Sequence, residues 1–431
     1  MPQLLPLRLL ETVGLRAADA RAARAAERAA SAGDVSGAGG SEDRSARPDV
    51  SQDEVSQPSQ DEASQPTQPG TSQPGTSQPG ASQPDTSQPS RPEVSHRDAA
   101  RAGSAQPPTG VVDIDPAIES TGPLSIIAPR RIGESELTVY PLSLGASVFG
   151  WTADGETSLA ILDRFAELGG DFIDTADSYV GGRSELLIGR WMHERGNRDR
   201  VTVATKVGRH HENRGLGAVS IVRAVEASLE RLQTDHIDLL YFHDDDPETP
   251  LEDSLATAEW LIESGKVRYL GASNFSADRL IEARILASSG LPKFVAIQTQ
   301  YNLMHRTEFE SAPRIVAAAQ GLGVMPYYAL ANGFLTGKYR SKGDLTAGAR
   351  SARASAYVNR RGQRVLAALD RIAAEHRVAP ATIALAWLLA KRTVVAPVAS
   401  ASRPDQVDAL MAAAGIRLTR AQMLELDRVS E

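Results

Sequence analysis

Short apolar segments alternate with amphipathic helical segments over roughly the last 300 residues of the chain, and this alternation constrains the fold more than any other feature of the sequence. We interpret eight of the apolar segments as β-strands, at residues 142–146, 171–175, 201–205, 237–242, 267–272, 294–298, 323–327 and 394–398. Apolar residues recur at the i, i+3, i+4 spacing of a helix face in intervening segments such as residues 158–169, 220–232, 251–265 and 381–391. Eight strand–helix units in a domain of this size predict a (β/α)8 TIM barrel.

The main alternative is an open, doubly wound sheet. A dinucleotide-binding sheet of that kind carries the spacing G-x-G-x-x-G after its first strand, and residues 144–150, with the sequence LGASVFG, lack it. We therefore favour the barrel. Residues 130–141 predict a small β-hairpin that turns at Glu134–Ser135 and caps the bottom of the barrel, and residues 418–430 predict an extra C-terminal helix.

The N-terminal region differs from the rest of the chain in composition and predicts a disordered extension. It is rich in Ser, Gln, Pro, Gly and Asp, and from Ser72 to Ser87 the tripeptide SQP returns every five residues. Regularly spaced proline prevents helix and sheet hydrogen bonding, and the region has little apolar surface to bury. Residues 15–30 alone have the composition of a surface helix. A passive linker is the default interpretation, and a partner-binding role is the alternative. The expected domains are an extension, residues 1–125, and a barrel, residues 126–431.

The composition excludes several classes of function. The net charge of −8 provides no basic field that would favour nucleic acid or an anionic membrane surface as a partner. The chain has no cysteine, which excludes disulfides, thiolate catalysis and cysteine-ligated metals. No apolar segment reaches the ~18 residues that a membrane helix needs, and Arg8 interrupts the N-terminal leucine patch, unlike in a signal peptide. We expect a cytoplasmic protein that acts on a small molecule, and the oligomeric state stays open.

Polar residues follow several of the predicted strands at the point where each strand ends. Asp174 and Tyr179 follow the second strand, Lys206 the third and His243 the fourth. The later strands end in Ser273, Asn274, Gln298, Gln300, Tyr327 and Tyr328. Each of these residues alone has a structural explanation, such as capping a turn or filling the rim. Because the carboxyl ends of barrel strands form one mouth, we expect them to converge on a single site.

The four residues Asp174, Tyr179, Lys206 and His243 suit the protonation of a developing alkoxide. The pKa of a free tyrosine is about 10, and a nearby lysine ammonium lowers it, while an aspartate keeps the lysine charged and oriented. A histidine can bind the reacting oxygen. Such a set, with neither a metal nor a thiol, implies hydride transfer between a nicotinamide cofactor and a carbonyl group.

Other polar or aromatic residues near these strands have competing interpretations. Asp177 and Ser178 are interpreted as residues that only close the second strand. We predict no metal site, because no spaced set of histidines and carboxylates accompanies the run Asp244–Asp246, which is better explained as a solvated loop. Trp151 either lines a substrate pocket together with His243 or packs at the rim of the barrel.

Six segments of the sequence resemble the motifs of the aldo-keto reductase superfamily. FIDTADSY (residues 172–179) is similar to the D-T-A-x-x-Y signature of the family, ATK (204–206) to its lysine strand and YFH (241–243) to its histidine strand. The segments GASNF, IQTQYNLMHR and PYYALANGFLTGKY are similar to the motifs G-x-S-N-F, Q-x-x-Y-N-L and Y-x-x-L-x-x-G-x-L-T-G-K. The resemblance extends from about Arg130 to Glu431. It is specific for the family and carries little information about the substrate.

The resemblance implies a catalytic tetrad of Asp174, Tyr179, Lys206 and His243, with Tyr179 as the general acid, and NADPH/NADP+ as the cofactor. The residues implied to bind the cofactor are Ser273, Asn274 and Gln298 at the nicotinamide carboxamide, Tyr327 on the nicotinamide ring, Leu330, Gly333, Leu335, Gly337 and Lys338 around the pyrophosphate, and Ser400, Ser402, Arg403 and Gln406 at the adenosine 2′-phosphate.

Two positions depart from the pattern of the family. Tyr328 stands where the family has a serine, and Ser402 stands where many members have a basic residue, which weakens the preference for NADPH over NADH. The expected activity is NADP(H)-dependent reduction of aldehydes or ketones to alcohols. The alternative is a nicotinamide-binding regulatory or sensor subunit with little turnover. Such a subunit would have no use for an intact tetrad.

Overall fold

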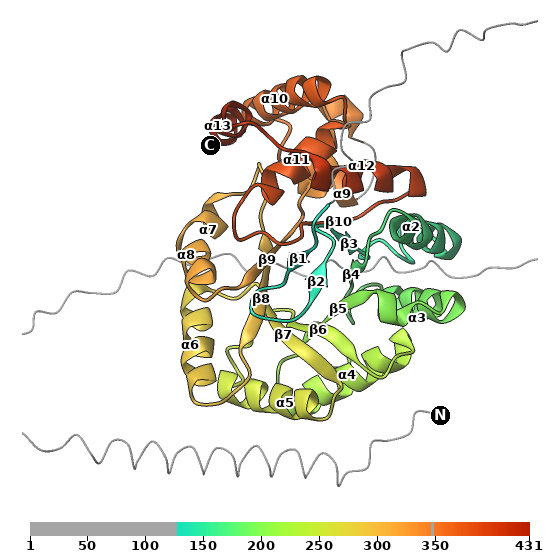
Figure 1. Cartoon of the computed structure of the whole chain (residues 1–431), viewed down its shortest axis with the longest axis vertical. Helices are drawn as coiled ribbons and strands as arrows, with labels where there is room; N and C mark the ends of the chain where they lie inside the picture. The colour runs from blue at the N-terminus through green and yellow to red at the C-terminus, as the bar shows by residue number, and fades with distance from the viewer. Residues whose placement is uncertain (1–126, 346–348) are drawn as a thin grey trace, which may run out of the picture. The chain divides into compact units, whose positions relative to one another are not determined.

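The strands of the structure form one parallel barrel. The computed structural model describes residues 127–345 and 349–431, so the predicted extension, with its SQP repeats and the expected surface helix at residues 15–30, lies outside the described residues. Eight parallel strands follow one another in the order β10-β3-β4-β5-β6-β7-β8-β9 (Figure 1). Their bounds are β3 Ser143–Gly145, β4 Phe172–Asp174, β5 Thr202–Val207, β6 Ile237–Phe242, β7 Val267–Ser273, β8 Phe294–Gln300, β9 Gly323–Tyr327 and β10 Val398–Ala399.

The barrel closes between β9 and the segment that leads into β10. The amide of Val324 donates to the carbonyl of Thr393 at 3.0 Å, and the amide of Val395 donates to the carbonyl of Val324 at 2.9 Å. The predicted (β/α)8 barrel is thereby confirmed. The last strand differs from the prediction, because β10 spans Val398–Ala399 and shares only residue 398 with the strand expected at 394–398. Pro397 lacks an amide hydrogen and contributes only its carbonyl, which accepts from Ser143.

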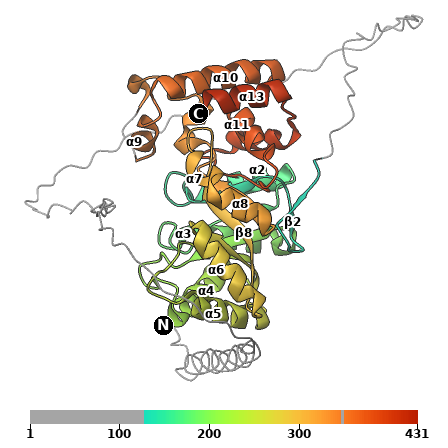
Figure 2. The same cartoon turned by 90° about the vertical axis from the view of Figure 1, so that its left-hand side faces the viewer.

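Helices surround the barrel, as Figures 1 and 2 show. The α-helices are α2 Gly155–Glu167, α3 Arg183–Arg195, α4 Ala218–Leu232, α5 Leu251–Glu263, α6 Ala277–Ser288, α7 Thr307–Glu310, α8 Ala312–Ala319, α9 Ala349–Ser355, α10 Arg360–His376, α11 Pro380–Leu389, α12 Val407–Met411 and α13 Arg420–Val429. The 3-10 helices are η1 Arg198–Arg200, η2 Ala331–Thr336, η3 Lys342–Asp344, η4 Pro404–Gln406 and η5 Ala412–Gly415. The expected C-terminal helix is α13, which packs against α10 (Figure 2).

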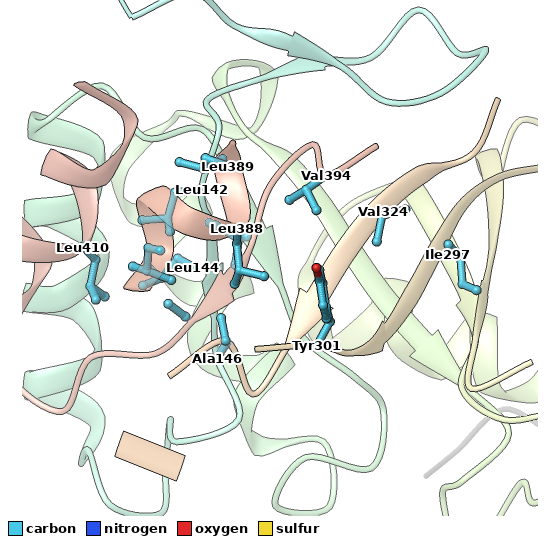
Figure 3. Packing of buried hydrophobic residues seen from close by; sticks show 14 of the residues in the cluster. Leu142, Leu144, Ala146, Ile297, Tyr301, Val324, Leu388, Leu389, Val394 and Leu410 are labelled. Carbon is cyan, nitrogen blue, oxygen red and sulfur yellow. The ribbon is translucent and has the colours of Figure 1, made fainter. Parts of the chain in front are cut away.

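The core between the strands and the helices is continuous and apolar. Figure 3 shows Leu142 and Leu144 from the start of the barrel near Leu388 and Leu389 of α11. All four side chains belong to one buried cluster that extends around the outside of the barrel. Burial of a leucine side chain stabilises a fold by about 1.5–3 kcal/mol, so this layer holds the helices in place around the strands.

A second apolar cluster fills the inside of the barrel and includes the predicted hairpin. The hairpin consists of β1 Arg130–Arg131 and β2 Thr138–Val139, which pair antiparallel. Its side chains Ile132, Leu137 and Val139 are buried against inward-pointing residues of the barrel strands. The hairpin therefore caps the amino ends of the strands, as predicted, and leaves the carboxyl ends as the open side.

Gly133 lies in the tightest part of this cap. Its φ is +51°, and a Cβ atom there would lie 2.1 Å from the carbonyl oxygen of Val295 and 2.9 Å from that of Gly321. A methyl group at this position therefore collides with backbone that cannot move without displacing β8 and β9.

We predict that Gly133→Ala lowers the free energy of unfolding by more than about 3 kcal/mol. Gly169→Ala is the matched control, because Gly169 also has a positive φ, of +82°, but no atom lies within 4 Å of its added Cβ. The control should cost only about 1 kcal/mol of backbone strain. Urea denaturation of the two variants measures the difference, and equal losses would contradict the tight packing of the hairpin.

Candidate active site

The side chain of Lys206 is the centre of a buried hydrogen-bond network. Its Nζ donates to Asp174 Oδ1 at 2.7 Å, to the carbonyl of Thr175 at 2.7 Å and to the hydroxyl of Tyr179 at 3.3 Å. Asp174 is held from its other side by Gln298, whose Nε2 donates to Oδ2 at 2.7 Å. Lys206 has an exposed fraction of 0% and Asp174 of 1%, so the ion pair is shielded from solvent.

The alternation of side chains along the strands explains why these residues meet. Residues two apart on a strand point to the same side of the sheet. Phe172, Ala204 and Leu239 belong to the apolar interior of the barrel, and two residues further along the same strands come Asp174, Lys206 and Tyr241. The polar residues are thus the last inward-pointing positions before the strands leave the barrel. The same rule places His243 above Tyr241, and Gln298 above Ala296.

The charges of Lys206 and Tyr179 follow from burial and from each other. Burial alone would lower the pKa of Lys206, but the Asp174 carboxylate and the Tyr179 phenol raise it above its ordinary value. Burial is also the largest influence on Tyr179 and raises its pKa, while the Lys206 ammonium acts in the opposite direction. The expected lowering of the tyrosine pKa is therefore present as an influence but is outweighed by desolvation. Tyr179 consequently carries its proton at neutral pH.

His243 lies beside Tyr179, directly after β6. The two ring centroids are 6.0 Å apart and the planes meet at 78°. Burial, together with the positive charges of Lys206 and Arg209, lowers the pKa of His243 to about 2. The imidazole is therefore neutral at physiological pH. Its Nδ1 is buried and has no hydrogen-bond partner among the residues that the structure describes.

A cavity of about 940 Å³ opens above this network at the carboxyl ends of the strands. It brings together most of the side chains that the sequence predicts at the site. The predicted residues that line it are Trp151, Asp174, Tyr179, His243, Ser273, Asn274, Gln298, Tyr327, Tyr328, Leu330, Gly333, Lys338, Ser400, Ser402, Arg403 and Gln406. Lys206, Gln300, Leu335 and Gly337 do not line it. Lys206 lies beneath the cavity wall and donates to Asp174 and Tyr179, which line it, whereas Leu335 is buried in the core.

Asn274 connects several parts of the cavity wall. Its Nδ2 donates to the carbonyl of His243 and to Asp244 Oδ1, both at 3.0 Å. Its Oδ1 accepts from the hydroxyl of Tyr327 at 2.8 Å. The residue adopts φ of +59°, a conformation that asparagine tolerates better than most residues. These contacts fix both the amide of Asn274 and the ring of Tyr327 at the edge of the cavity.

The loop after β9 approaches the cavity with a strained backbone. Ala331, Asn332 and Gly333 have consecutive positive φ values of 48°, 55° and 87°. A Cβ atom on Gly333 would lie 3.0 Å from Cε and 3.1 Å from Nζ of Lys338, so glycine at this position lets the ammonium lie close to the backbone. Strained residues of this kind concentrate at functional sites.

The far end of the cavity lies after β10. Arg403 is exposed, and its Nε and Nη2 donate to the two carboxylate oxygens of Asp405, each at 3.0 Å. Gln406 accepts from the amide of Ser402 at 2.8 Å and thereby shapes this turn.

Several residues that line the cavity were not expected from the sequence. They are Gly145, Ser147, Ser178, Arg209, Ala329, Asn332, Thr336, Arg353, Ala379, Ala381, Val398, Ala399, Ala409 and Leu410. Of these, Asn332 has a recognisable signal, because an Asn-Gly pair is typical of backbone with positive φ. Arg209 and Arg353 have none, since an arginine in a loop is usually solvated.

The acidic run after β6 is occupied by structural contacts. Asp244 pairs with Arg209, Asp245 accepts from Arg279, and Asp246 accepts from the amide of Leu216. Within residues 127–345 and 349–431, no three His, Cys, Asp or Glu side chains gather as metal ligands. The same residues contain no helix that is long and apolar enough to cross a membrane.

Asp177, interpreted from the sequence as a residue that only closes β4, is fully buried near the site. Burial and the neighbouring carboxylate of Glu185 raise its pKa to about 7, outweighing the influence of Arg231 and Ser178. Neither of its oxygens has a partner at hydrogen-bond geometry within the described part of the chain. Glu185 is also buried, and it accepts from Thr205 and from Arg231.

The open end of the parallel barrel thus brings a half-buried tyrosine together with a buried lysine, aspartate and histidine. The family model described as the Aldo/keto reductase family matches residues 141–431 of the chain, and the chain belongs to this family.

Named relatives differ in the activity that their names state. Norsolorinic acid reductase B of Aspergillus parasiticus is 34% identical over 319 residues, which cover 69% of this chain and 82% of that protein. An aryl-alcohol dehydrogenase of Pestalotiopsis microspora is 30% identical over 328 residues, 72% of this chain and 84% of that protein. A probable voltage-gated potassium channel subunit beta of Oryza sativa subsp. japonica is 33% identical over 291 residues, 64% of this chain and 88% of that protein. Membership of the family and the first two names support an oxidoreductase.

We predict that Asp177 makes stability depend on pH. Its folded pKa of about 7 lies above the value of about 3.9 expected in the unfolded chain, so its stabilising proton is lost as the pH rises through 7. Asp177→Asn cannot lose this proton. Between pH 5 and pH 8, the variant should gain on the order of 1–3 kcal/mol in unfolding free energy relative to the parent protein. Urea denaturation at both pH values measures this, with the surface variant Asp199→Asn as a control; parallel pH curves for the parent and Asp177→Asn would refute it.

Proposed function

We propose that the chain is an NADP(H)-dependent oxidoreductase that reduces aldehydes or ketones to alcohols, with Tyr179 as the general acid. The observation that carries this proposal is the Tyr179 hydroxyl, which lies at the wall of the cavity 3.3 Å from the buried ammonium of Lys206. A phenol that is protonated at neutral pH and has a cation beside its oxygen is suited to give up a proton during a reaction.

The bound nicotinamide cofactor would supply a hydride to the carbonyl carbon of the substrate. Tyr179 donates its proton to the carbonyl oxygen, so that the carbonyl group becomes an alcohol. The negative charge then left on the Tyr179 oxygen is stabilised by Lys206, which Asp174 and the carbonyl of Thr175 hold in place. This stabilisation grows as the proton leaves, and interactions that strengthen toward the transition state accelerate the reaction. In the reverse reaction, the oxidation of an alcohol, Tyr179 would take the proton of the alcohol hydroxyl back.

His243 would bind the reacting oxygen. Because its imidazole is neutral, it does not compete with Tyr179 as an acid, and it can offer an N–H donor to the carbonyl oxygen. The carbonyl oxygen would thereby lie between Tyr179 and His243, whose rings stand edge to face on the same wall of the cavity.

The cavity fits an extended dinucleotide. Its volume of about 940 Å³ lies at the upper end of the range for ligand pockets. Ser273, Asn274 and Gln298 would hold the carboxamide and Tyr327 the ring of the nicotinamide. Leu330, Gly333 and Lys338 would hold the pyrophosphate, while Leu335 and Gly337, which do not line the cavity, would shape the loop. Arg403, with Ser400, Ser402 and Gln406, would hold a 2′-phosphate, and an arginine fork suits such a dianion. Competitive titration with NADPH and NADH tests this last assignment.

A regulatory role is the second candidate, and the similarity to the rice protein named as a channel subunit is the observation that favours it. A subunit that only binds the cofactor has no need of Lys206 beneath the tyrosine. Tight NADPH binding without turnover of any carbonyl compound would favour this role over the enzyme.

We predict that Tyr179→Phe lowers kcat for aldehyde reduction by at least about 100-fold, because the proton donor is removed. Affinity for NADPH should change by less than about threefold. Both quantities are measured by NADPH absorbance and fluorescence. The matched control is Tyr269→Phe, which removes a hydroxyl at the opposite end of the barrel, where it accepts from the amide of Glu136. Full activity of Tyr179→Phe would rule out Tyr179 as the acid.

We also propose that residues 126–431 form the catalytic domain on their own. Deletion of residues 1–125 should leave the thermal midpoint of unfolding unchanged and kcat/KM within about twofold of the full chain, because most of the extension has little apolar surface to contribute to a core. Circular dichroism and the NADPH assay check this prediction. Failure of the shortened chain to fold would place the domain boundary elsewhere.

A further inference from the structure

Arg209 is a charged residue of the cavity to which the proposed mechanism gives no task. It follows β5 by two residues, lines the cavity together with Tyr179 and His243, and has a side chain that is 46% exposed. Its positive charge contributes to the lowered pKa of His243, which shows that the guanidinium acts on the reaction end of the cavity.

One edge of the Arg209 guanidinium is held in place. Its Nε and Nη2 donate to the two carboxylate oxygens of Asp244, and Asp244 Oδ1 also accepts from Asn274 at 3.0 Å. The orientation of the fork is therefore fixed by a residue that is itself anchored. Asp244 occupies two of the five N–H groups of Arg209, so the other three can donate to a ligand in the cavity that Arg209 lines. A donor that is already oriented loses less entropy when it binds a ligand.

The charges around the cavity are unequal. Among the described residues that line it, Arg209, Lys338, Arg353 and Arg403 are cationic, and Asp174 is the carboxylate. Asp174 is compensated by Lys206 beneath it, while Arg209 is paired with Asp244 and Arg403 with Asp405, two carboxylates that do not line the cavity. In the proposed function Lys338 and Arg403 bind phosphates of the cofactor. Arg209 is different, because it lies with Tyr179 and His243, where the substrate reacts.

We propose that Arg209 binds a carboxylate on the substrate, and that the substrates are aldehydes or ketones carrying such a group. This inference rests on the proposed function and specifies its substrate class. The planar fork of arginine matches a carboxylate, and such charge-assisted hydrogen bonds are stronger than neutral ones. Trp151 lines the same cavity with 55% of its surface exposed, which provides an apolar surface for the body of the substrate.

The test compares 4-carboxybenzaldehyde with its methyl ester, which keeps the ring and the aldehyde but removes the negative charge. We expect the parent protein to favour the acid in kcat/KM. Arg209→Met should lower kcat/KM for the acid by roughly tenfold to 100-fold and for the ester by much less. Arg209→Lys should restore part of the preference. Arg214→Met is the matched control, because Arg214 lies in the same loop, is exposed and does not line the cavity, and its acid-to-ester ratio should equal that of the parent.

A binding measurement separates this inference from the proposed function. Benzoate cannot be reduced in this assay, so its dissociation constant, measured by calorimetry with NADP+ present, is independent of turnover. Weaker benzoate binding by at least about fivefold in Arg209→Met, but not in Arg214→Met, supports the carboxylate site even if neither aldehyde is reduced. Equal losses for acid and ester, or benzoate binding that does not depend on Arg209, would overturn it.

Discussion

The buried ion pair between Lys206 and Asp174 is the interaction on which the rest of the site depends. Burying two charges is costly, and it is tolerated where both have further hydrogen bonds. Here Lys206 also donates to Thr175 and Tyr179, and Asp174 accepts from Gln298. The pair therefore joins β4 and β5 to β8, a strand that lies elsewhere in the barrel. Its ammonium lies beside the tyrosine oxygen, which the proposed proton transfer would use.

Above this pair, the side chains that line the cavity differ in chemistry from one end to the other. The reaction end holds a protonated phenol and a neutral imidazole, whereas the loop after β9 and the turn after β10 carry the lysine and the arginine assigned to phosphate groups. In the proposal above, Arg209 would add a site for a substrate carboxylate next to the reaction end. Because these groups come from different strand ends and loops, substrate preference can change through a loop residue without disturbing the buried network.

The barrel could be predicted from periodicity, and so could the convergence of Asp174, Lys206 and His243 at its mouth. The inward-pointing positions alternate, and Asp174, Lys206 and His243 stand at the ends of apolar strands where such positions reach the mouth. Other features depend on long-range packing that no local pattern records. The raised pKa of Asp177 results from burial beside Glu185, and the orientation of Arg209 results from Asp244, 35 residues away. The shortness of β10 was missed because the missing amide hydrogen of Pro397 shortens a strand only if a neighbouring strand would otherwise accept from it, and the sequence does not show which strand lies there.

The seam of the barrel, where β9 meets β10 and the segment before it, affects the cooperativity of unfolding. On one side of the seam lies β9, followed by the strained loop that carries Lys338; on the other lies β10, which has two residues and is followed by the turn at Arg403. Few backbone hydrogen bonds join these two sides, so local opening is easier here than between the longer strands β5 to β8. A dinucleotide that contacts both sides would hold them together across the seam. Its binding energy would then suppress local unfolding, and amide hydrogens around Val324 would exchange more slowly in the presence of the cofactor.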